Sequence, residues 1–415
     1  MLVRIPVKQL KLGMYIHELC GSWMDHPFAR GTFLLDDPKD LKTMLTTGIK
    51  EVWIDTNKGI GLSMEDDTSE GVSEEDISAE VEATLTGADK GIKKVERVNI
   101  AQEAARAVKI CAKSKQAVSS MFHEARMGNA LDAKDALPIV EEISTSVMRN
   151  PGALISLARL KDKDDYTYMH SVAVCALMVS LSRQLNLDET QTRLAGLAGL
   201  LHDVGKMMIP LGILNKPGKL TDPEFHTVRN HPSQGHKMLL EGKGISDVAL
   251  DVCLHHHEKI DGSGYPEKLT GEQISLYAKM GAVCDVYDAI TSNRPYKNGW
   301  EPTESLRKMA EWSSGHFDRR IFDAFVKSIG IYPIGSLVKL ESNRLGVVIE
   351  QTGKSLLTPV VKVFFSIKSN GRIASEILDL SKPGLKDKII SHEDPVKWNI
   401  HDIQELWSDM PVTPW

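Results

Sequence analysis

An apolar run that ends in two metal-ligand side chains constrains this chain more than any other stretch. Residues 194–201 are only Leu, Ala and Gly, which predicts a buried helix because apolar side chains favour leaving water. His202 and Asp203 follow at once, and Gly205 and Lys206 come directly after them. Histidine and aspartate are costly to bury unless they are paired or bound to metal. The run therefore predicts a buried site whose other ligands come from elsewhere in the chain.

The charge of the chain is unevenly distributed. The 415 residues are 42% hydrophobic and 26% charged, with a formal net charge of -6, as expected for a globular protein of roughly two or three domains. Ten acidic residues and no Lys or Arg lie between Lys58 and Lys90, and removing those ten from the net charge leaves +4 for the rest. The net charge therefore does not exclude an anionic ligand.

Cysteine usage and hydropathy predict the compartment. The five cysteines are widely spaced and form no CxxC motif, which is typical of a reducing environment rather than a disulfide scaffold. The first residues lack the apolar core of a signal peptide, and no run of about 18 apolar residues occurs. We expect a cytoplasmic protein without membrane insertion.

The pattern along the chain predicts a mainly α protein in five segments. Residues 1–60, where Val3, Ile5 and Val7 alternate, indicate a small α+β domain. Three further segments follow, and a small β appendage with a short docking helix ends the chain. In order after the first, the segments are an acidic flexible linker over 61–92, connecting helices over 93–150, a helical domain over 151–332 and the appendage with its tail over 333–415.

The connecting helices have two interpretations that the sequence leaves open. Their apolar residues recur every three to four positions, so each presents one apolar face. That face can pack on the helical domain that follows. It can also pair with a second copy of the chain, giving a homodimer, or with a signalling partner protein.

Histidines are concentrated in the predicted helical domain. Eight of the 14 histidines lie between residues 170 and 257, which is hard to reconcile with scattered structural histidines. Several helices would each present ligands inward, as in di-metal bundles. Imidazole and carboxylate without an obvious thiolate suit Fe, Mn, Co, Ni or Zn. The candidates are His170, His202, Asp203, His231, His255, His256, His257 and Asp285.

Three motifs together resemble the HD-GYP branch of the HD phosphohydrolases, which are bacterial phosphodiesterases for cyclic di-GMP. They are the His202-to-Lys206 stretch, residues 256–266 with Gly264-Tyr265-Pro266, and residues 285–297. The resemblance covers about residues 151–335 and implies a helical HD-type bundle with a di-metal site. The first 60 residues also resemble an uncharacterised domain often found before HD-GYP domains.

The resemblance implies a role for each matching position. One metal would be held by His170, His202, Asp203 and Asp285. The second would be held by His231, His256 and His257, with Asp203 bridging and His255 outside the ligand set. Lys206 would lie beside the scissile phosphate, and Tyr265, Arg294 and Lys297 would contact the dinucleotide, a guanine base stacking on Tyr265. Some members add a third metal through a glutamate where this chain has Tyr166, so we expect two metals.

The implied activity is hydrolysis of cyclic di-GMP, with Asp203 and Lys206 as the catalytic residues. A metal-bridging hydroxide would attack in line and give linear pGpG, with GMP as a further product. The cofactors would be two divalent transition-metal ions, Fe or Mn first and Co, Ni or Zn as alternatives, and no DNA partner is expected. Two other functions stay open: a cyclic di-GMP-binding signalling module with weak turnover, and a phosphohydrolase for another cyclic dinucleotide.

Overall fold

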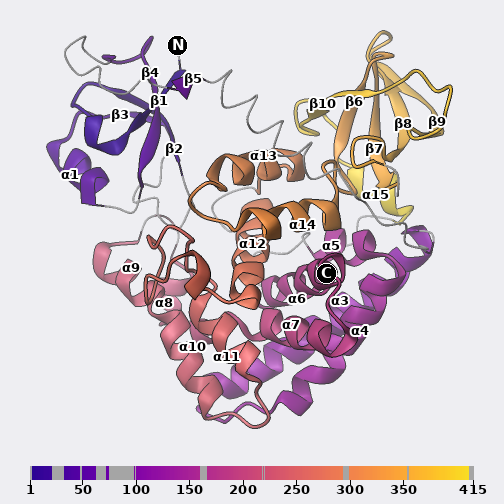
Figure 1. Ribbon diagram of the computed structural model, residues 1–415. Helices are drawn as coiled ribbons and strands as arrows, with labels where there is room; N and C mark the ends of the chain where they lie inside the picture. Colours follow the sequence, from indigo (N-terminus) through magenta and orange to yellow (C-terminus); the bar gives the residue numbers. More distant parts are fainter. Residues whose placement is uncertain are drawn as a thin grey trace.

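Two small sheets flank a larger helical body in the computed structural model of the chain (Figure 1). The helices form most of the structure, so the prediction of a mainly α protein is confirmed. The residues that the structure describes are 2–20, 32–46, 49–61, 72–73, 98, 100–158, 166–216, 218, 220–292, 299–352 and 355–410.

The N-terminal sheet is antiparallel, with the strand order β3-β2-β4-β1-β5. The predicted alternation is confirmed in part: Ile5 and Val7 are buried and Arg4 and Pro6 are half-buried, but Val3 is half-buried too. Residues 72–73 lie within the predicted acidic linker and pair with β1, whereas 62–71 and 74–92 lie outside the described residues. The elements are β1 (Leu2–Pro6), η1 (Val7–Gln9), β2 (Tyr15–Leu19), β3 (Phe33–Leu34), α1 (Pro38–Thr46), β4 (Glu51–Asp55) and β5 (Val72–Ser73).

The helical body begins with α3 and continues to α14. Short 3-10 turns and the four-residue α8 connect its longer helices. The elements are α3 (Ile100–Arg126), α4 (Ala133–Arg149), α5 (Pro151–Ala158), α6 (Tyr166–Gln184), α7 (Glu189–Leu201), η3 (Val204–Met208), α8 (Leu211–Leu214), α9 (Asp222–Arg229), α10 (His231–Leu240), α11 (Asp247–His255), η4 (Gly271–Gln273), α12 (Leu276–Thr291), α13 (Pro302–Trp312) and α14 (Arg319–Ile329).

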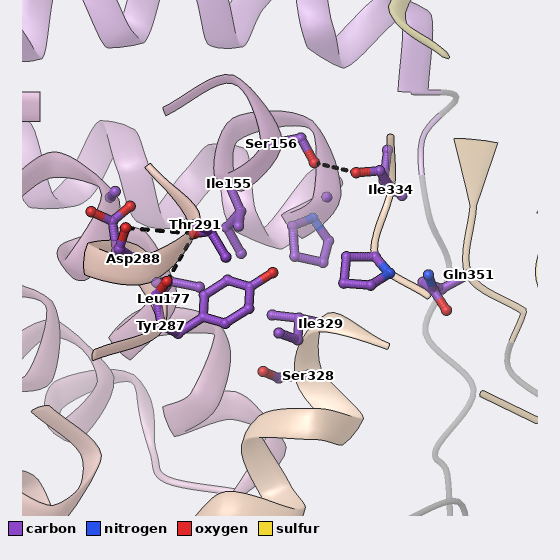
Figure 2. Close-up of a pocket in the computed structure, with 14 residues that line it drawn as sticks. Ile155, Ser156, Leu177, Tyr287, Asp288, Thr291, Ser328, Ile329, Ile334 and Gln351 are labelled. Carbon is purple, nitrogen blue, oxygen red and sulfur yellow. Dashed lines mark hydrogen bonds between the residues drawn. The ribbon is translucent and has the colours of Figure 1, made fainter. Parts of the chain in front are cut away.

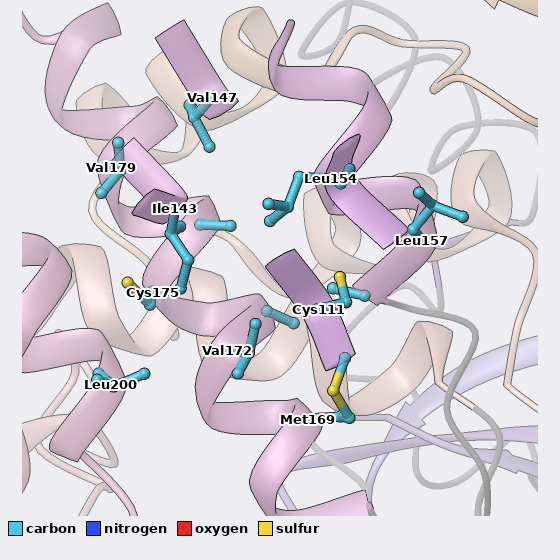
Figure 3. Packing of buried hydrophobic residues seen from close by; sticks show 14 of the residues in the cluster. Cys111, Ile143, Val147, Leu154, Leu157, Met169, Val172, Cys175, Val179 and Leu200 are labelled. Carbon is cyan, nitrogen blue, oxygen red and sulfur yellow. The ribbon is translucent and has the colours of Figure 1, made fainter. Parts of the chain in front are cut away.

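The core of the body joins the connecting helices to the helices that follow (Figure 3). Burying these apolar side chains is the main term that stabilises the body. Helices α3 and α4 therefore pack on the helical domain, the first of the two arrangements left open above; pairing with a second copy stays a prediction. The side chains that meet include Cys111 of α3, Ile143 and Val147 of α4, Leu154 and Leu157 of α5, Met169, Val172, Cys175 and Val179 of α6, and Leu200 of α7.

The C-terminal sheet is also antiparallel, with the strand order β10-β6-β7-β8-β9. Asn343 and Asn370 adopt positive φ angles between its strands, as short-turn asparagines can. The docking helix is confirmed, because Leu406 and Trp407 are buried in the core shared with α3. The elements are β6 (Leu337–Leu340), β7 (Arg344–Glu350), β8 (Val360–Ser366), β9 (Gly371–Asp379), β10 (Ile389–Glu393) and α15 (Ile403–Ser408).

The N-terminal sheet contacts the helical body at several points. Trp53 of β4 is buried in the cluster built from α12, α13 and α14. Lys308 of α13 binds Glu18 of β2 at 2.8 Å, and Lys50 forms an ion pair with Asp261. Among the described residues, each helix is either too short or too polar to cross a lipid bilayer.

Candidate metal centre

Helix α6 places His170 at the centre of the body. Its Nδ1 lies 2.6 Å from Asp288 Oδ2, and its Nε2 lies 2.9 Å from Asp285 Oδ1. Both carboxylates come from α12, which packs against α6. A carboxylate on Nδ1 keeps the proton there and leaves Nε2 as the metal-ligand atom. Tyr166, at the position of the absent third-metal glutamate, stacks on the His170 ring with centroids 5.7 Å apart.

Close packing of α7 on α6 brings His202 and Asp203 beside His170. A Cβ at Gly199 would lie 3.0 Å from the Val174 carbonyl oxygen, so a larger residue here would push the two helices apart by a few tenths of an ångström. His202 ends α7 and its Nδ1 donates to the Gly199 carbonyl at 2.8 Å. The apolar run predicted as a buried helix is thus confirmed, and its small residues position the His-Asp pair.

The start of α10 brings His231 to the other side of Asp203. A Cβ at Gly205 would lie 1.9 Å from the His231 carbonyl oxygen and 2.5 Å from the Gly235 amide nitrogen. Gly205 is therefore required for η3 to approach α10. His231 Nδ1 donates to the Val228 carbonyl at 2.7 Å, which turns Nε2 toward Asp203 Oδ1 at 3.2 Å.

The end of α11 supplies two further imidazoles. His256 Nδ1 lies 3.0 Å from the carbonyl oxygens of Val252 and Cys253, leaving Nε2 to face His231 Nε2 at 3.4 Å. His257 Nδ1 lies 3.6 Å from Asp285 Oδ2. All these side chains are buried among helices that close the site from several directions.

Seven buried side chains form two groups that share Asp203. In each group the candidate ligand atoms lie within 4.8 Å of one another. Atoms bound to one ion at about 2.0–2.2 Å are about 3 Å apart, so this spacing suits coordination after small adjustment. The first group is His170, His202, Asp203 and Asp285; the second is Asp203, His231, His256 and His257.

The groups differ in how they shift the pKa of their side chains. Burial alone would lower the pKa of His202, but Asp203 and Asp285 raise it to about 10. Burial opposes the charge of Asp203, yet Lys206 and His202 hold the pKa of its carboxyl well below the usual range. In the second group, burial and then the charge of His202 lower the pKa of His256 to about 3. This lowered pKa favours the neutral imidazole of His256, the form that binds metal.

Buried atoms without hydrogen-bond partners support a metal in each group. His202 Nε2, Asp203 Oδ1 and His257 Nε2 are buried and make no hydrogen bond within the described part of the chain. Such atoms are destabilising unless something binds them. They belong to both groups, and imidazole with carboxylate is a donor set that divalent transition metals prefer. The residues present therefore fit two metal ions.

The remaining predicted site residues lie around these groups. Lys206 places its ammonium against Asp203 Oδ2, and its side chain is mostly buried. His255 points away from the groups, with Nδ1 2.8 Å from Asp251 Oδ1. The Tyr265 ring lies 4.8 Å from the His257 ring, centroid to centroid. Arg294 and Lys297 lie outside the described residues.

Two acidic residues near the site were not singled out from the sequence. Asp288 lies one helical turn after Asp285, and this spacing on one helix face could have indicated it. Glu258 is buried and accepts backbone N–H groups of Glu267, Lys268 and Leu269 at 2.7–3.0 Å. It therefore closes the loop that carries Tyr265, a tertiary role without a local sequence pattern.

A small pocket lies beside Asp288, away from the predicted site residues (Figure 2). Ser156 in its wall donates to the Ile334 carbonyl at 3.1 Å, and Thr291 donates to the Tyr287 carbonyl at 2.8 Å. Asp288 both lines this pocket and holds His170. The pocket thus abuts the metal centre only at its supporting carboxylate, among the residues that the structure describes.

Comparison with known proteins gives matches along the whole chain. A domain of unknown function (DUF3391) matches residues 2–136, and the HD domain matches residues 150–321. Cyclic di-GMP phosphodiesterase PA4108 of Pseudomonas aeruginosa is 55% identical over 99% of this chain and 96% of its own length. The match to residues 2–136 runs through the acidic segment and α3, while the five predicted segment boundaries stay predictions.

Two further matches each cover a part of this chain. The cyclic di-GMP phosphodiesterase response regulator RpfG of Xanthomonas campestris pv. campestris is 40% identical over 35% of this chain and 39% of its own length. The 3′3′-cGAMP-specific phosphodiesterase 1 of Vibrio cholerae is 36% identical over 40% of this chain and 38% of its own length. The chain belongs to the HD-GYP family of HD-domain proteins, and it carries an N-terminal DUF3391 domain.

Proposed function

We propose that this chain is a metal-dependent phosphodiesterase that hydrolyses cyclic di-GMP. The observation that carries the proposal is the position of Asp203, whose two oxygens face different ligand groups. Oδ2 lies 3.4 Å from His170 Nε2 and 3.4 Å from His202 Nε2, while Oδ1 lies 3.2 Å from His231 Nε2. One carboxylate can therefore serve two metal ions. The full-length similarity to a cyclic di-GMP phosphodiesterase supports the substrate.

The chain's own residues supply the support for in-line hydrolysis. Metals bound in the two groups would polarise the phosphate and provide a nucleophile from water at neutral pH. Asp203 and Asp285 carry the negative charge of the site, and the surrounding helices keep bulk water away from it. Lys206 places an ammonium group beside Asp203, where it would offset negative charge that grows on the phosphate.

The residues for the dinucleotide and the identity of the metal extend this proposal. Lys206 and Tyr265 would contact the substrate from within the described chain, and Arg294 and Lys297 from the segment after α12. Imidazole and carboxylate ligands support Fe or Mn, with Co, Ni or Zn as alternatives. Linear pGpG would be the first product and GMP a further one. The five cysteines are thiols rather than disulfides, which supports a reducing, cytoplasmic environment.

A similar protein suggests a second candidate substrate. The Vibrio cholerae match is named for 3′3′-cGAMP, which differs from cyclic di-GMP in one base. Metal binding and phosphate attack would be the same for both, so the choice between them depends on residues that contact the base.

The test is a hydrolysis assay with metal-depleted protein reloaded anaerobically with each metal in turn. We expect cyclic di-GMP to be converted to pGpG by the Fe- or Mn-loaded protein, and no conversion by the depleted protein. Tight binding of cyclic di-GMP without product under every metal would replace the enzyme with a binding module. Faster turnover of 3′3′-cGAMP than of cyclic di-GMP would reassign the substrate.

A further inference from the structure

Arg229, the last residue of α9, lies over the ring of Tyr265. Its guanidinium carbon is 4.3 Å from the Tyr265 ring centroid and 5.9 Å from that of Phe225. At these distances a guanidinium is attracted to the aromatic face. Because Tyr265 in turn lies beside His257, Arg229 is one ring away from the second ligand group.

The charge of Arg229 is not neutralised by a carboxylate. Among the residues that the structure describes, Arg229 forms no ion pair, although its side chain is partly buried. The nearby cations behave differently: Lys216 binds Glu224 at 2.6 Å and Lys206 contacts Asp203. An arginine that is held in place by stacking and forms no ion pair is suited to bind an anionic or aromatic ligand.

Tyr265 offers little surface of its own to a base. It is 9% exposed, with Arg229 over its ring and the His257 ring 4.8 Å away. Arg229 is half-buried, so more of its side chain than of the tyrosine ring stays open to a base. Arginine planes stack on nucleobases as aromatic side chains do.

We propose that Arg229 is a further substrate-binding residue, whose guanidinium stacks on one guanine of the dinucleotide while Tyr265 supports it from beneath. This inference rests on the proposed function. Stacking needs the planar group and not only the charge. Arg229 would therefore act through its planar group, whereas Lys206 would act through its charge.

The test compares Arg229→Ala and Arg229→Lys with the unaltered protein, all metal-loaded. Arg372→Ala is the control away from the site, because Arg372 also lies over an aromatic ring, Phe364, in the C-terminal sheet, where it forms an ion pair with Asp402. The readouts are KM and kcat for cyclic di-GMP, the Kd by titration, and the metal content. Loss of one base stack predicts that KM and Kd rise about tenfold in Arg229→Ala. We expect kcat to change by less than about twofold, since the metal ligands are untouched.

The two variants separate stacking from charge. Arg229→Lys keeps the charge and loses the plane, so we expect a rise in KM close to that of Arg229→Ala. Unaltered KM and Kd in Arg229→Ala, or full rescue by lysine, would overturn the inference. So would loss of bound metal in Arg229→Ala, because Arg229 would then support the site only. If the unaltered protein neither binds nor hydrolyses cyclic di-GMP, the proposed function itself fails.

Discussion

The two ligand groups share one aspartate and differ in how some of their imidazoles are held. In the first group, the side chain of Asp288 fixes His170 at 2.6 Å, whereas the Gly199 carbonyl fixes His202 at 2.8 Å. In the second, the backbone carbonyls of Val228 and Val252 fix His231 and His256 at 2.7 and 3.0 Å. A side chain can be replaced without moving the chain, whereas a carbonyl follows the helix end that carries it. The first group should therefore respond to substitution of Asp288, whereas His231 and His256 should respond to changes in helix packing.

The largest effect is expected for Asp203→Ala, because this residue belongs to both groups. Metal content should fall at both positions, and hydrolysis should drop by more than the roughly 10–100-fold that follows loss of an outer partner. Metal analysis and product chromatography measure this. Asp247→Ala, at an exposed aspartate that starts α11, is the control. Retention of full rate by Asp203→Ala would remove the shared carboxylate from the mechanism.

Gly205→Ala should disturb the second group through the backbone. The new methyl would meet the His231 carbonyl at 1.9 Å, so η3 and α10 must move apart. We expect about 1–3 kcal/mol of lost stability, with weaker metal binding at the second group. Thermal unfolding and metal titration check this.

Gly212→Ala provides the matched control, because a Cβ at Gly212 would meet nothing within 4 Å. It should leave the unfolding temperature and the metal content unchanged. Equal unfolding temperatures and equal metal contents in the two alanine variants would show that close packing of η3 on α10 does not support the metal site.

Asp288→Asn should affect the first group alone. The amide keeps the shape of the side chain but loses the charge that orients the His170 ring. Metal affinity at the first position and the rate should fall by about 10–100-fold, with the second position still filled. Competition with a metal indicator resolves the two positions. Equal weakening of both sites would contradict the separate support of the two groups.

The smallest effect is expected for His255→Ala, since His255 faces Asp251 and Glu267 rather than the metals. Burial lowers the pKa of His255, but Asp251 and Glu267 raise it above the ordinary value. A raised folded-state pKa stabilises the protein below about pH 6.5 and ceases to do so as the pH rises through the folded value.

The stability of the His255→Ala variant should depend on pH. Because the raised pKa stabilises the folded protein only at lower pH, the substitution should lower the free energy of unfolding by no more than about 1 kcal/mol at pH 5.5, and by less at pH 9. Unfolding at the two pH values checks the sign. A variant with reduced metal content would mean that His255 is a ligand after all.

Much of this arrangement could be predicted from residue order. The apolar run before His202 predicted a buried helix, and the apolar stretches after residue 333 predicted the β appendage. The two groups of side chains that the structure brings together are those expected from the family resemblance. Their roles as ligands stay proposals.

The features of the site that the sequence did not predict depend on contacts between segments that are far apart in the chain. Asp288 contacts His170, 118 residues away, and this pairing follows only from the packing of α12 on α6. The Gly205 approach to α10 depends on two segments that meet only in the fold. Arg229, at the end of α9, covers the ring of Tyr265, which lies in a loop far away in the sequence. The Gly264-Tyr265-Pro266 motif therefore gave no indication that the tyrosine is buried. The predicted contacts of Arg294 and Lys297 lie outside the described residues.

The most direct test of the shared-carboxylate centre is a crystal structure of the metal-loaded protein with anomalous scattering from the metal. We predict two peaks, one within reach of His170, His202 and Asp285 and the other within reach of His231, His256 and His257, with an oxygen of Asp203 bound to each. A single peak, or two peaks of which one makes no contact with Asp203, would contradict this centre.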